Sequence, residues 1–268
     1  MYLLAHLKDL IEYKELLYNL AKKELKIKYK NSALGFFWSL LNPILTMLVF
    51  SLVFVVIFKF KGIEYYSIFL LAGLLPWNFF NASVMGGAGS IIANSSLVKK
   101  VYFPRELIPI SVALASLVNL FLELLVFLVF IIVVGFLSPK YFAVFKFLPY
   151  LVILLPILFL FSVGLALLVA ALNVYLRDIQ HIITILLMVW FYASPIIYKI
   201  DGMVPPKLIP FYKLNPMTDI ILSFKSVLYW RHAPNLNWVL LSLFYAIISF
   251  LIGYAVFLRL EPDFAEEL

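Results

Sequence analysis

Residues 91–110, IIANSSLVKKVYFPRELIPI, form a short polar and basic interruption between two long apolar runs. The polar residues 94–96 end the first run, and Pro104 and Pro109 discourage a simple helical continuation into the second. Three basic side chains lie between them, at Lys99, Lys100 and Arg105. We interpret this segment as the loop through which a membrane-embedded chain receives force or information from a soluble partner.

The composition around this segment is that of a membrane protein. Of the 268 residues, 65% are hydrophobic and 13% are charged, and the mean hydropathy is +1.06. Soluble domains carry about a quarter charged residues. Long continuous apolar runs favour transmembrane helices over the alternating strands of a membrane barrel. We therefore expect an all-α integral membrane fold. The chain contains no cysteine, which excludes disulfides and thiolate chemistry.

The N-terminal residues 1–33 are charged and lack the uninterrupted apolar core of a signal peptide. Wound as a helix, they place apolar side chains on one side and lysines on the other. The apolar side carries Leu16, Leu17, Leu20 and Ile27, and the basic side carries Lys22, Lys23, Lys26 and Lys30. This pattern predicts an amphipathic helix that lies at the membrane interface.

Residues 34–268 are predicted to form a single membrane domain. A hydrocarbon core of about 30 Å takes about 20 residues to cross. Six apolar stretches suit that length: 34–58, 66–90, 108–137, 147–172, 181–198 and 237–258. An even number of spans puts both termini on one side, and the seven lysines before the first span put that side in the cytoplasm. Residues 91–110 are then cytoplasmic as well.

The longest segment between spans, residues 199–236, is expected to lie on the outer side. Within it, residues 219–230 (DIILSFKSVLYW) have apolar residues at helical spacing but are too few to cross the membrane. Several prolines precede them, at positions 205, 206, 210 and 216. We predict one or two short reentrant helices that dip into the outer leaflet before the last span.

No motif for nucleotide binding, hydrolysis or metal coordination is present. The glycine-rich run at 86–90, GGAGS, lacks the lysine and the strand-to-helix context of a phosphate loop. Its small residues favour close packing of helices instead. HExxH, GxSxG and zinc-ligand spacings are missing, and three scattered histidines make no metal site. We expect a chain without enzymatic activity, cofactor, metal or nucleic-acid partner.

Glu123 is a carboxylate near the middle of the third predicted span. An ionisable residue there is a functional candidate by default. The structural interpretation is that Glu123 is protonated or hydrogen-bonded to Asn119, one turn earlier on the same face. We favour the structural interpretation, because one isolated carboxylate without an intramembrane Lys or Arg makes a poor proton relay.

Aromatic residues cluster at the start of the first span and within the fifth. The clusters are Phe36, Phe37 and Trp38, and Trp190, Phe191 and Tyr192. Ordinary packing explains any one of these residues. Aromatic faces also suit the C–H faces of sugar rings, and a polymer track needs many weak contacts because conduction requires release as well as entry.

Several runs resemble the permease subunits of ABC-2 type polysaccharide exporters, those of O-antigen exporters most of all. They are KKVYFPRELIP at 99–109, NVYLRDIQHI at 173–182, YASPIIY at 192–198 and LNPMTDIILSFK at 214–225. The order of the predicted elements agrees with this family over nearly the whole chain. The resemblance implies a homodimeric permease in the bacterial inner membrane, with two copies of an ATP-binding subunit that carry the ATP and Mg²⁺.

The resemblance also implies roles for particular segments. The coupling helix that docks on the ATP-binding subunit maps onto about residues 94–105, the interface helix onto 10–30 and the periplasmic gate helices onto 205–230. Spans one and five, with the two aromatic clusters, would line the path. A polysaccharide linked to polyprenyl pyrophosphate would enter beside Lys26, Lys28 and Lys30. The coupling residues are Ser95, Leu97, Lys99, Lys100, Tyr102, Phe103 and Arg105, with Arg177 and Asp178.

Other interpretations remain open at this point. Arg177 and Asp178 form either a second coupling contact or a turn whose charges neutralise each other near the headgroups. The cargo of an ABC-2 permease is alternatively a capsule, a teichoic acid, a lipid or a small amphiphile. A membrane-embedded glycan-processing enzyme would need an acidic metal-binding pair, and the sequence has no D-x-D. A proton-coupled carrier would need several buried ionisable groups.

Overall fold

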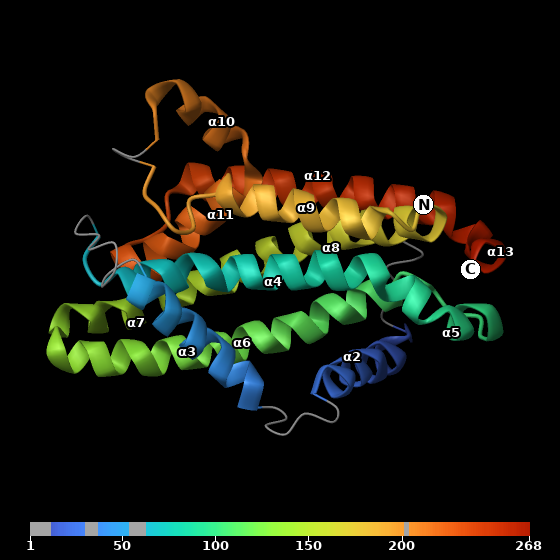
Figure 1. The fold of residues 1–268 in the computed structure, drawn as a ribbon, viewed down its shortest axis with the longest axis horizontal. Helices are drawn as coiled ribbons and strands as arrows, with labels where there is room; N and C mark the ends of the chain where they lie inside the picture. The colour runs from blue at the N-terminus through green and yellow to red at the C-terminus, as the bar shows by residue number, and fades with distance from the viewer. Residues whose placement is uncertain (1–11, 30–36, 54–62, 201–203) are drawn as a thin grey trace.

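The computed structural model describes residues 12–29, 37–53, 63–200 and 204–268. Every regular element in these residues is helical. Four long helices lie along the long axis of the molecule: α4 (Tyr66–Ala93), α6 (Leu107–Leu137), α8 (Leu151–Tyr175) and α12 (Leu236–Leu260) (Figure 1). The central helix α4 packs against both α6 and α8, and α8 packs against α12. The all-α prediction is confirmed for the described part of the chain.

These four helices agree with four of the six predicted spans. Among the described residues, they are the helices long and apolar enough to cross a membrane. The first and fifth predicted spans appear as the shorter apolar helices α3 (Phe37–Ser51) and α9 (Ile179–Tyr192). At a rise of 1.5 Å per residue, helices of this length extend about 21–23 Å, less than the hydrocarbon core. Residues 34–36 and 54–58 of the first predicted span lie outside the described residues.

Small residues bring the long helices into close contact. A Cβ atom on Gly253 of α12 would clash with the carbonyl oxygen of Gly164 on α8, so only glycine permits this approach. Gly87 of α4 has the same function against α8, because its Cβ would lie 2.7 Å from that of Ala166. The interpretation of the 86–90 run as a packing motif is confirmed at Gly87, whereas Gly89 makes no such close approach.

The N-terminal amphipathic helix is α2 (Lys14–Tyr29), which packs beside α6. Leu20 is buried, with Leu16 and Leu17 packed against the same cluster, while Lys22 and Lys26 are exposed. Burial of one face is what the periodicity predicted. Ile27 was expected on that face but is exposed in this single chain.

The segment expected to form short helices does so. It contains η4 (Pro206–Leu208), α10 (Ile209–Leu214), α11 (Pro216–Lys225) and the π-helical turn η5 (Ser226–Trp230). Asn215 begins α11 by accepting a hydrogen bond from the Met217 amide at 3.0 Å through Oδ1. The short helices stand at the end of the molecule opposite α5 (Ser95–Lys100) (Figure 1).

Two side chains, one at the N-cap of α11 and one within α11, bind the YASPIIY turn at the end of α9. The Asn215 Nδ2 group donates to the Ala193 carbonyl at 3.0 Å and to Ser194 Oγ at 3.1 Å. The fully buried Lys225 donates through Nζ to the carbonyls of Pro195 and Ile196, at 2.6 and 2.9 Å. Two of the runs that carry the family resemblance therefore bind each other.

Lys225 is also held by an aromatic ring. Its Nζ lies 3.3 Å from the centroid of the Phe69 ring of α4, a cation–π contact. Burial, with some repulsion from Lys199, lowers the pKa of Lys225 well below its usual value. The carbonyls and the ring compensate for the lost hydration of a buried ammonium group.

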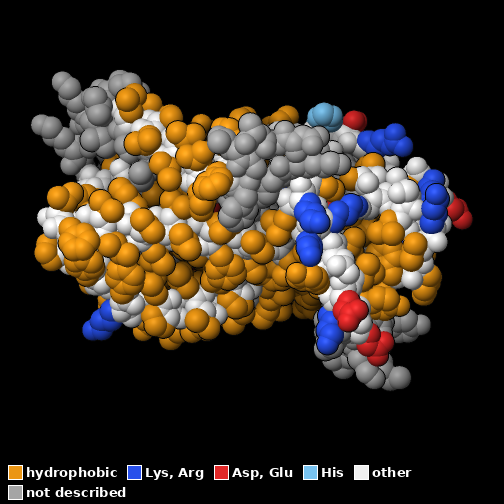
Figure 2. Space-filling model, turned by 90° about the horizontal axis from the view of Figure 1, so that it is seen from below, with side chains coloured by type: hydrophobic (Ala, Val, Ile, Leu, Met, Phe, Trp, Pro, Cys, Tyr) orange, Lys and Arg blue, Asp and Glu red, His pale blue; other side chains and the backbone are white. Residues whose placement is uncertain are grey.

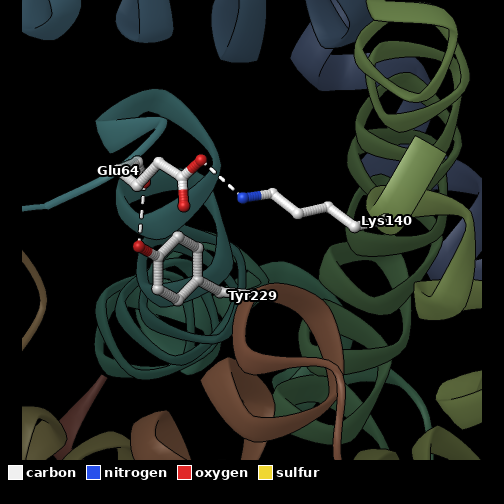
Figure 3. Close-up of polar contacts among 3 residues, drawn as sticks. All are labelled: Glu64, Lys140 and Tyr229. Carbon is white, nitrogen blue, oxygen red and sulfur yellow. Dashed lines mark hydrogen bonds and ion pairs between the residues drawn. The ribbon is translucent and has the colours of Figure 1, made fainter. Parts of the chain in front are cut away.

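A second set of contacts closes the same end of the molecule. Lys140 Nζ forms an ion pair with Glu64 Oε1 at 2.5 Å, and Tyr229 donates its hydroxyl to the Glu64 carbonyl at 2.8 Å (Figure 3). The segment before α4 is thereby tied to the α6–α8 connection and to η5. Burial is the largest of the causes that raise the pKa of Tyr229, to about 12.

Candidate functional site

The other end of the bundle gathers the segments that the sequence placed on one side of the membrane. Here α4 turns into α5, α8 turns into α9, and α12 runs into α13 (Phe264–Glu267) (Figure 1). Most of the charged side chains visible on the face in Figure 2 gather toward this end, and hydrophobic side chains cover most of the remainder. We call this region the α5 end.

A buried asparagine forms the corner between α4 and α5. Asn94 Nδ2 donates to the Ser90 carbonyl at 2.9 Å, which satisfies a carbonyl in the last turn of α4. Asn94 Oδ1 accepts from Lys23 Nζ of α2 at 2.5 Å. The amphipathic helix is therefore attached directly to the corner from which α5 projects.

The segment after this corner alternates sharply between buried and exposed side chains. Val98 and Phe103 are buried in a cluster that includes Leu20 of α2 and Phe264 of α13. Tyr102, next to Phe103, is 98% exposed. Lys99 and Lys100 are exposed, and Ser95 and Leu97 are half-buried. The result is a fixed support that presents a tyrosine and two lysines outward.

Arg105 does not belong to that outward-facing set. Its backbone amide donates to Glu261 Oε1 at 3.2 Å, and its guanidinium donates to the Glu261 carbonyl. The side chain is half-buried between the start of α6 and the end of α12. The structure thus gives Arg105 a positioning role, although the sequence grouped it with the exposed residues Lys99 and Tyr102.

Glu106 and Tyr254 are parts of this support that the sequence interpretation missed. Glu106 is fully buried and accepts a hydrogen bond from the Tyr254 hydroxyl at 3.2 Å. A carboxylate directly after Arg105, in a segment with two further lysines, gives no sign of burial in a linear sequence. Only the approach of α12 to the start of α6 reveals the contact.

The α8–α9 turn is organised by Asn173 and Tyr175 of the NVYLRDIQHI run. Asn173 donates to the Ala88 carbonyl of α4 at 2.8 Å and accepts from the Gln180 amide at 3.2 Å. Tyr175 donates to the Leu260 carbonyl at 2.9 Å. Arg177 and Asp178 lie exposed at the tip of the turn, at the same end as α5.

Glu123 has partners that the sequence did not suggest. Asn78 of α4 donates to its Oε2 across the helix interface at 3.5 Å, while Asn119 donates to the Ala115 carbonyl of its own helix at 3.0 Å. Lys28 of α2 attracts the carboxylate electrostatically. Lys28 belongs to the interface helix α2 and not to a membrane span, so the expectation that Glu123 has no intramembrane Lys or Arg partner stays a prediction.

The residues proposed for a polymer path fall into two groups. Phe37, Trp38 and Tyr192 are exposed. Trp190 is half-buried and donates to Asn215 Oδ1 at 2.7 Å, and Phe191 packs edge-on against Trp77. Of the entrance lysines, Lys26 and Lys28 are exposed. Phe36 and Lys30 lie outside the described residues. No group of three or more His, Asp or Glu side chains suited to a metal ion occurs in the described ranges.

Comparison with known proteins identifies the relatives of this chain. The sequence model of one family, described as ABC-2 type transporter, matches residues 15–229. The chain is 32% identical over 266 residues to the O-antigen export system permease protein RfbA of Myxococcus xanthus, covering 97% of this chain and 98% of the relative. A Klebsiella pneumoniae protein of the same name is 32% identical over 254 residues, 95% of each chain. The polysialic acid transport protein KpsM of Escherichia coli is 24% identical over 88% of this chain and 89% of the relative.

Proposed function

Because the chain belongs to the ABC-2 type transporter family, we propose that it is the membrane permease of an ATP-driven polysaccharide exporter, with an O-antigen-like polymer as its cargo. Relatives along nearly the full length of the chain are named for O-antigen export, and a more distant one for polysialic acid transport. The chain is a transport subunit, and ATP hydrolysis belongs to a separate ATP-binding subunit.

The observation that carries this proposal is the α5 end. A permease without a nucleotide site must receive mechanical work from a partner, and a rigid surface element is suited to that task. Val98 and Phe103 anchor α5 in the cluster with α2 and α13, and Tyr102 projects from it. We assign Lys99, Lys100 and Tyr102 to the docking surface, with Arg177 and Asp178 as its second part.

The polymer path is proposed to lie between two copies of the chain. In the described residues, the centre of one copy is filled by packed aromatic rings: Trp77, Phe80, Phe161 and Trp190. A filled bundle leaves no route wide enough for a sugar chain. The short helices α3 and α9 carry exposed apolar side chains, including Leu48 and Met188. We propose that they complete six crossings and face the partner copy across the path.

The orientation and the lipid carrier complete the proposal. The seven lysines before the first span support an α5 end, and both termini, on the cytoplasmic side of the inner membrane. A carrier with a pyrophosphate group would be attracted by the lysines of α2, of which Lys26 and Lys28 are exposed. The short helices α10 and α11 would then lie at the periplasmic side as reentrant gate helices.

A reconstitution experiment tests this function. The chain is co-expressed with the ATP-binding protein encoded beside it, purified and placed in liposomes that contain a polyprenyl-pyrophosphate-linked polysaccharide. We expect a stable complex whose ATP hydrolysis drives the polymer across the bilayer. A chain that binds no P-loop ATPase would refute the proposal. ATP-dependent movement of a lipid without polysaccharide would refute the cargo.

A further inference from the structure

A cavity of about 650 Å³ lies at the end of the chain opposite α5. It is bounded by the start of α4, the segment after α9, α10, α11 and the start of α12. The volume falls within the range of small-ligand sites, about 300–1,000 Å³. It lies within a single copy of the chain and takes no part in the α5 surface.

Aromatic side chains form much of the wall. Tyr198, Tyr212, Trp230 and Trp238 are half-buried, and the buried Phe69 lies behind them. The hydroxyls of Tyr198 and Tyr212 lie 2.8 Å apart and are hydrogen-bonded to each other. This bond and the edge-to-face packing of the two rings fix their position.

Two buried polar side chains that line the cavity have an atom without a hydrogen-bond partner. Asp219 is 4% exposed, and Thr218 is 2% exposed. Within the described part of the chain, neither Asp219 Oδ2 nor Thr218 Oγ1 has a hydrogen-bond partner. Leaving such buried atoms without a hydrogen-bond partner is energetically unfavourable. Both residues line the cavity, although these two oxygens are themselves buried, so a rotation of each side chain toward the cavity would let ligand hydroxyls restore what burial removes.

The charges of the wall restrict the class of ligand. Lys225 is engaged with two carbonyls and the Phe69 ring, and Lys199 lies on the segment after α9. Lys199 opposes a cationic ligand, and Lys225, whose Nζ is engaged with two carbonyls and a ring, is not available to bind an anionic one. The ligand class that remains is a neutral polyhydroxyl ring. Such a ring offers hydroxyls to Asp219 and apolar C–H faces to the aromatic rings.

We propose that this cavity binds a neutral pyranose unit, with its hydroxyls donating to Asp219 and Thr218 and its ring against Trp230 or Trp238. The inference rests on the proposed function only for the source of the sugar, which is either the exported polymer or another glycan.

Tryptophan fluorescence of the purified full chain in nanodiscs tests the binding directly, without any ATPase. The probes are D-glucose, D-mannose, D-galactose, L-rhamnose and N-acetylglucosamine, each titrated to about 100 mM, well above a millimolar Kd. Glycerol serves as a non-cyclic control. We expect a saturable change with at least one pyranose, because two of the five tryptophans, Trp230 and Trp238, line the cavity.

Matched variants identify the site. Asp219→Asn keeps the shape but replaces one acceptor oxygen with an NH2 donor, so the half-saturating concentration should rise at least about tenfold. Thr218→Val should weaken binding in the same direction. Glu64→Gln is the control, because Glu64 is an acidic residue at the same end but outside the cavity lining (Figure 3). A response that is linear for every sugar, or unchanged in Asp219→Asn, overturns the proposal.

The source of the sugar follows from the reconstituted exporter. If Asp219→Asn also slows polymer export while the ATP-binding subunit still binds, the exported polymer supplies the sugar. If sugar binding is lost and export is unchanged, another glycan occupies the site. Binding is measured on the isolated chain, so failure of the export function itself would leave the binding result intact.

Discussion

Truncation of Tyr102 is the sharpest test of the docking surface. The side chain is 98% exposed, so Tyr102→Ala should change the stability of the isolated permease by no more than about 0.5 kcal/mol. A tyrosine buried in a partner's groove covers about 150–250 Å², which corresponds to about 4–6 kcal/mol of gross hydrophobic gain at 25 cal/mol per Å². Ordering and desolvation consume part of that gain. We expect a net loss of about 2–3 kcal/mol, or about 30- to 150-fold in affinity for the ATP-binding subunit.

The assay titrates the ATP-binding subunit onto the permease in nanodiscs, with a thermal unfolding curve recorded in parallel. The neighbouring Phe103→Ala is the matched comparison, because Phe103 is 5% exposed and packs in the cluster with Leu20 and Phe264. Removing a buried phenylalanine typically costs about 3–5 kcal/mol of stability. Phe103→Ala should therefore lower the melting temperature, whereas Tyr102→Ala should lower affinity alone. Wild-type affinity for Tyr102→Ala would refute docking at this surface.

Three further predictions concern the rest of the chain. Gly253→Ala should destabilise the α8–α12 contact by about 1–3 kcal/mol or more and lower the melting temperature. Gly89→Ala should be tolerated, because its new Cβ would lie 3.8 Å from the nearest neighbouring atom. Equal melting curves for the two variants would contradict this reasoning. Burial raises the pKa of Asp219 to about 7, so between about pH 4 and 7 the folded chain keeps a proton that the unfolded chain has released. The free energy of unfolding should therefore fall as pH rises from about 4 through 7, and Asp219→Asn should flatten that fall. An unchanged slope in Asp219→Asn would be the contrary result. Glu123→Gln should leave transport largely intact in the liposome assay, because Asn78 and Lys28 are structural neighbours, and abolished transport with normal folding would assign Glu123 a functional role.

The long helices could be predicted because their signal is local. A run of about 20 apolar residues is itself the physical requirement for crossing a bilayer, so α4, α6, α8 and α12 follow from composition. The amphipathic helix α2 follows from periodicity in the same way. The short helices α3 and α9 were harder to predict, because an apolar run of sequence does not show where the helix within it ends.

The candidate site was predicted in part. Its position at the α5 end follows from charge and from the interruption at 91–110. The sequence did not show which residues of that segment form the buried support and which face outward, because Arg105 and Tyr102 look equally available for docking in the linear sequence. The contact of Arg105 with Glu261 depends on two helices 156 positions apart in the chain.

The cavity and its neighbouring lysine were not predicted at all. Asp219 and Lys225 read as ordinary charges on a short amphipathic helix. The burial of Lys225 is accompanied by bonds to the YASPIIY turn, whose carbonyls at Pro195 and Ile196 receive its Nζ. Such partnerships join segments about 30 residues apart and leave no periodic trace in either segment.

The buried Lys225 also bears on how the chain is assembled during synthesis. An uncompensated lysine in an apolar setting costs about 2.5–3.5 kcal/mol on insertion scales. The three groups that receive its ammonium, the Phe69 ring and the carbonyls of Pro195 and Ile196, all precede it in the chain. When residue 225 leaves the ribosome, its receptor has already been translated. Vectorial translation thus supplies the receptor before the charge, and a circular permutant that begins after residue 200 would reverse that order.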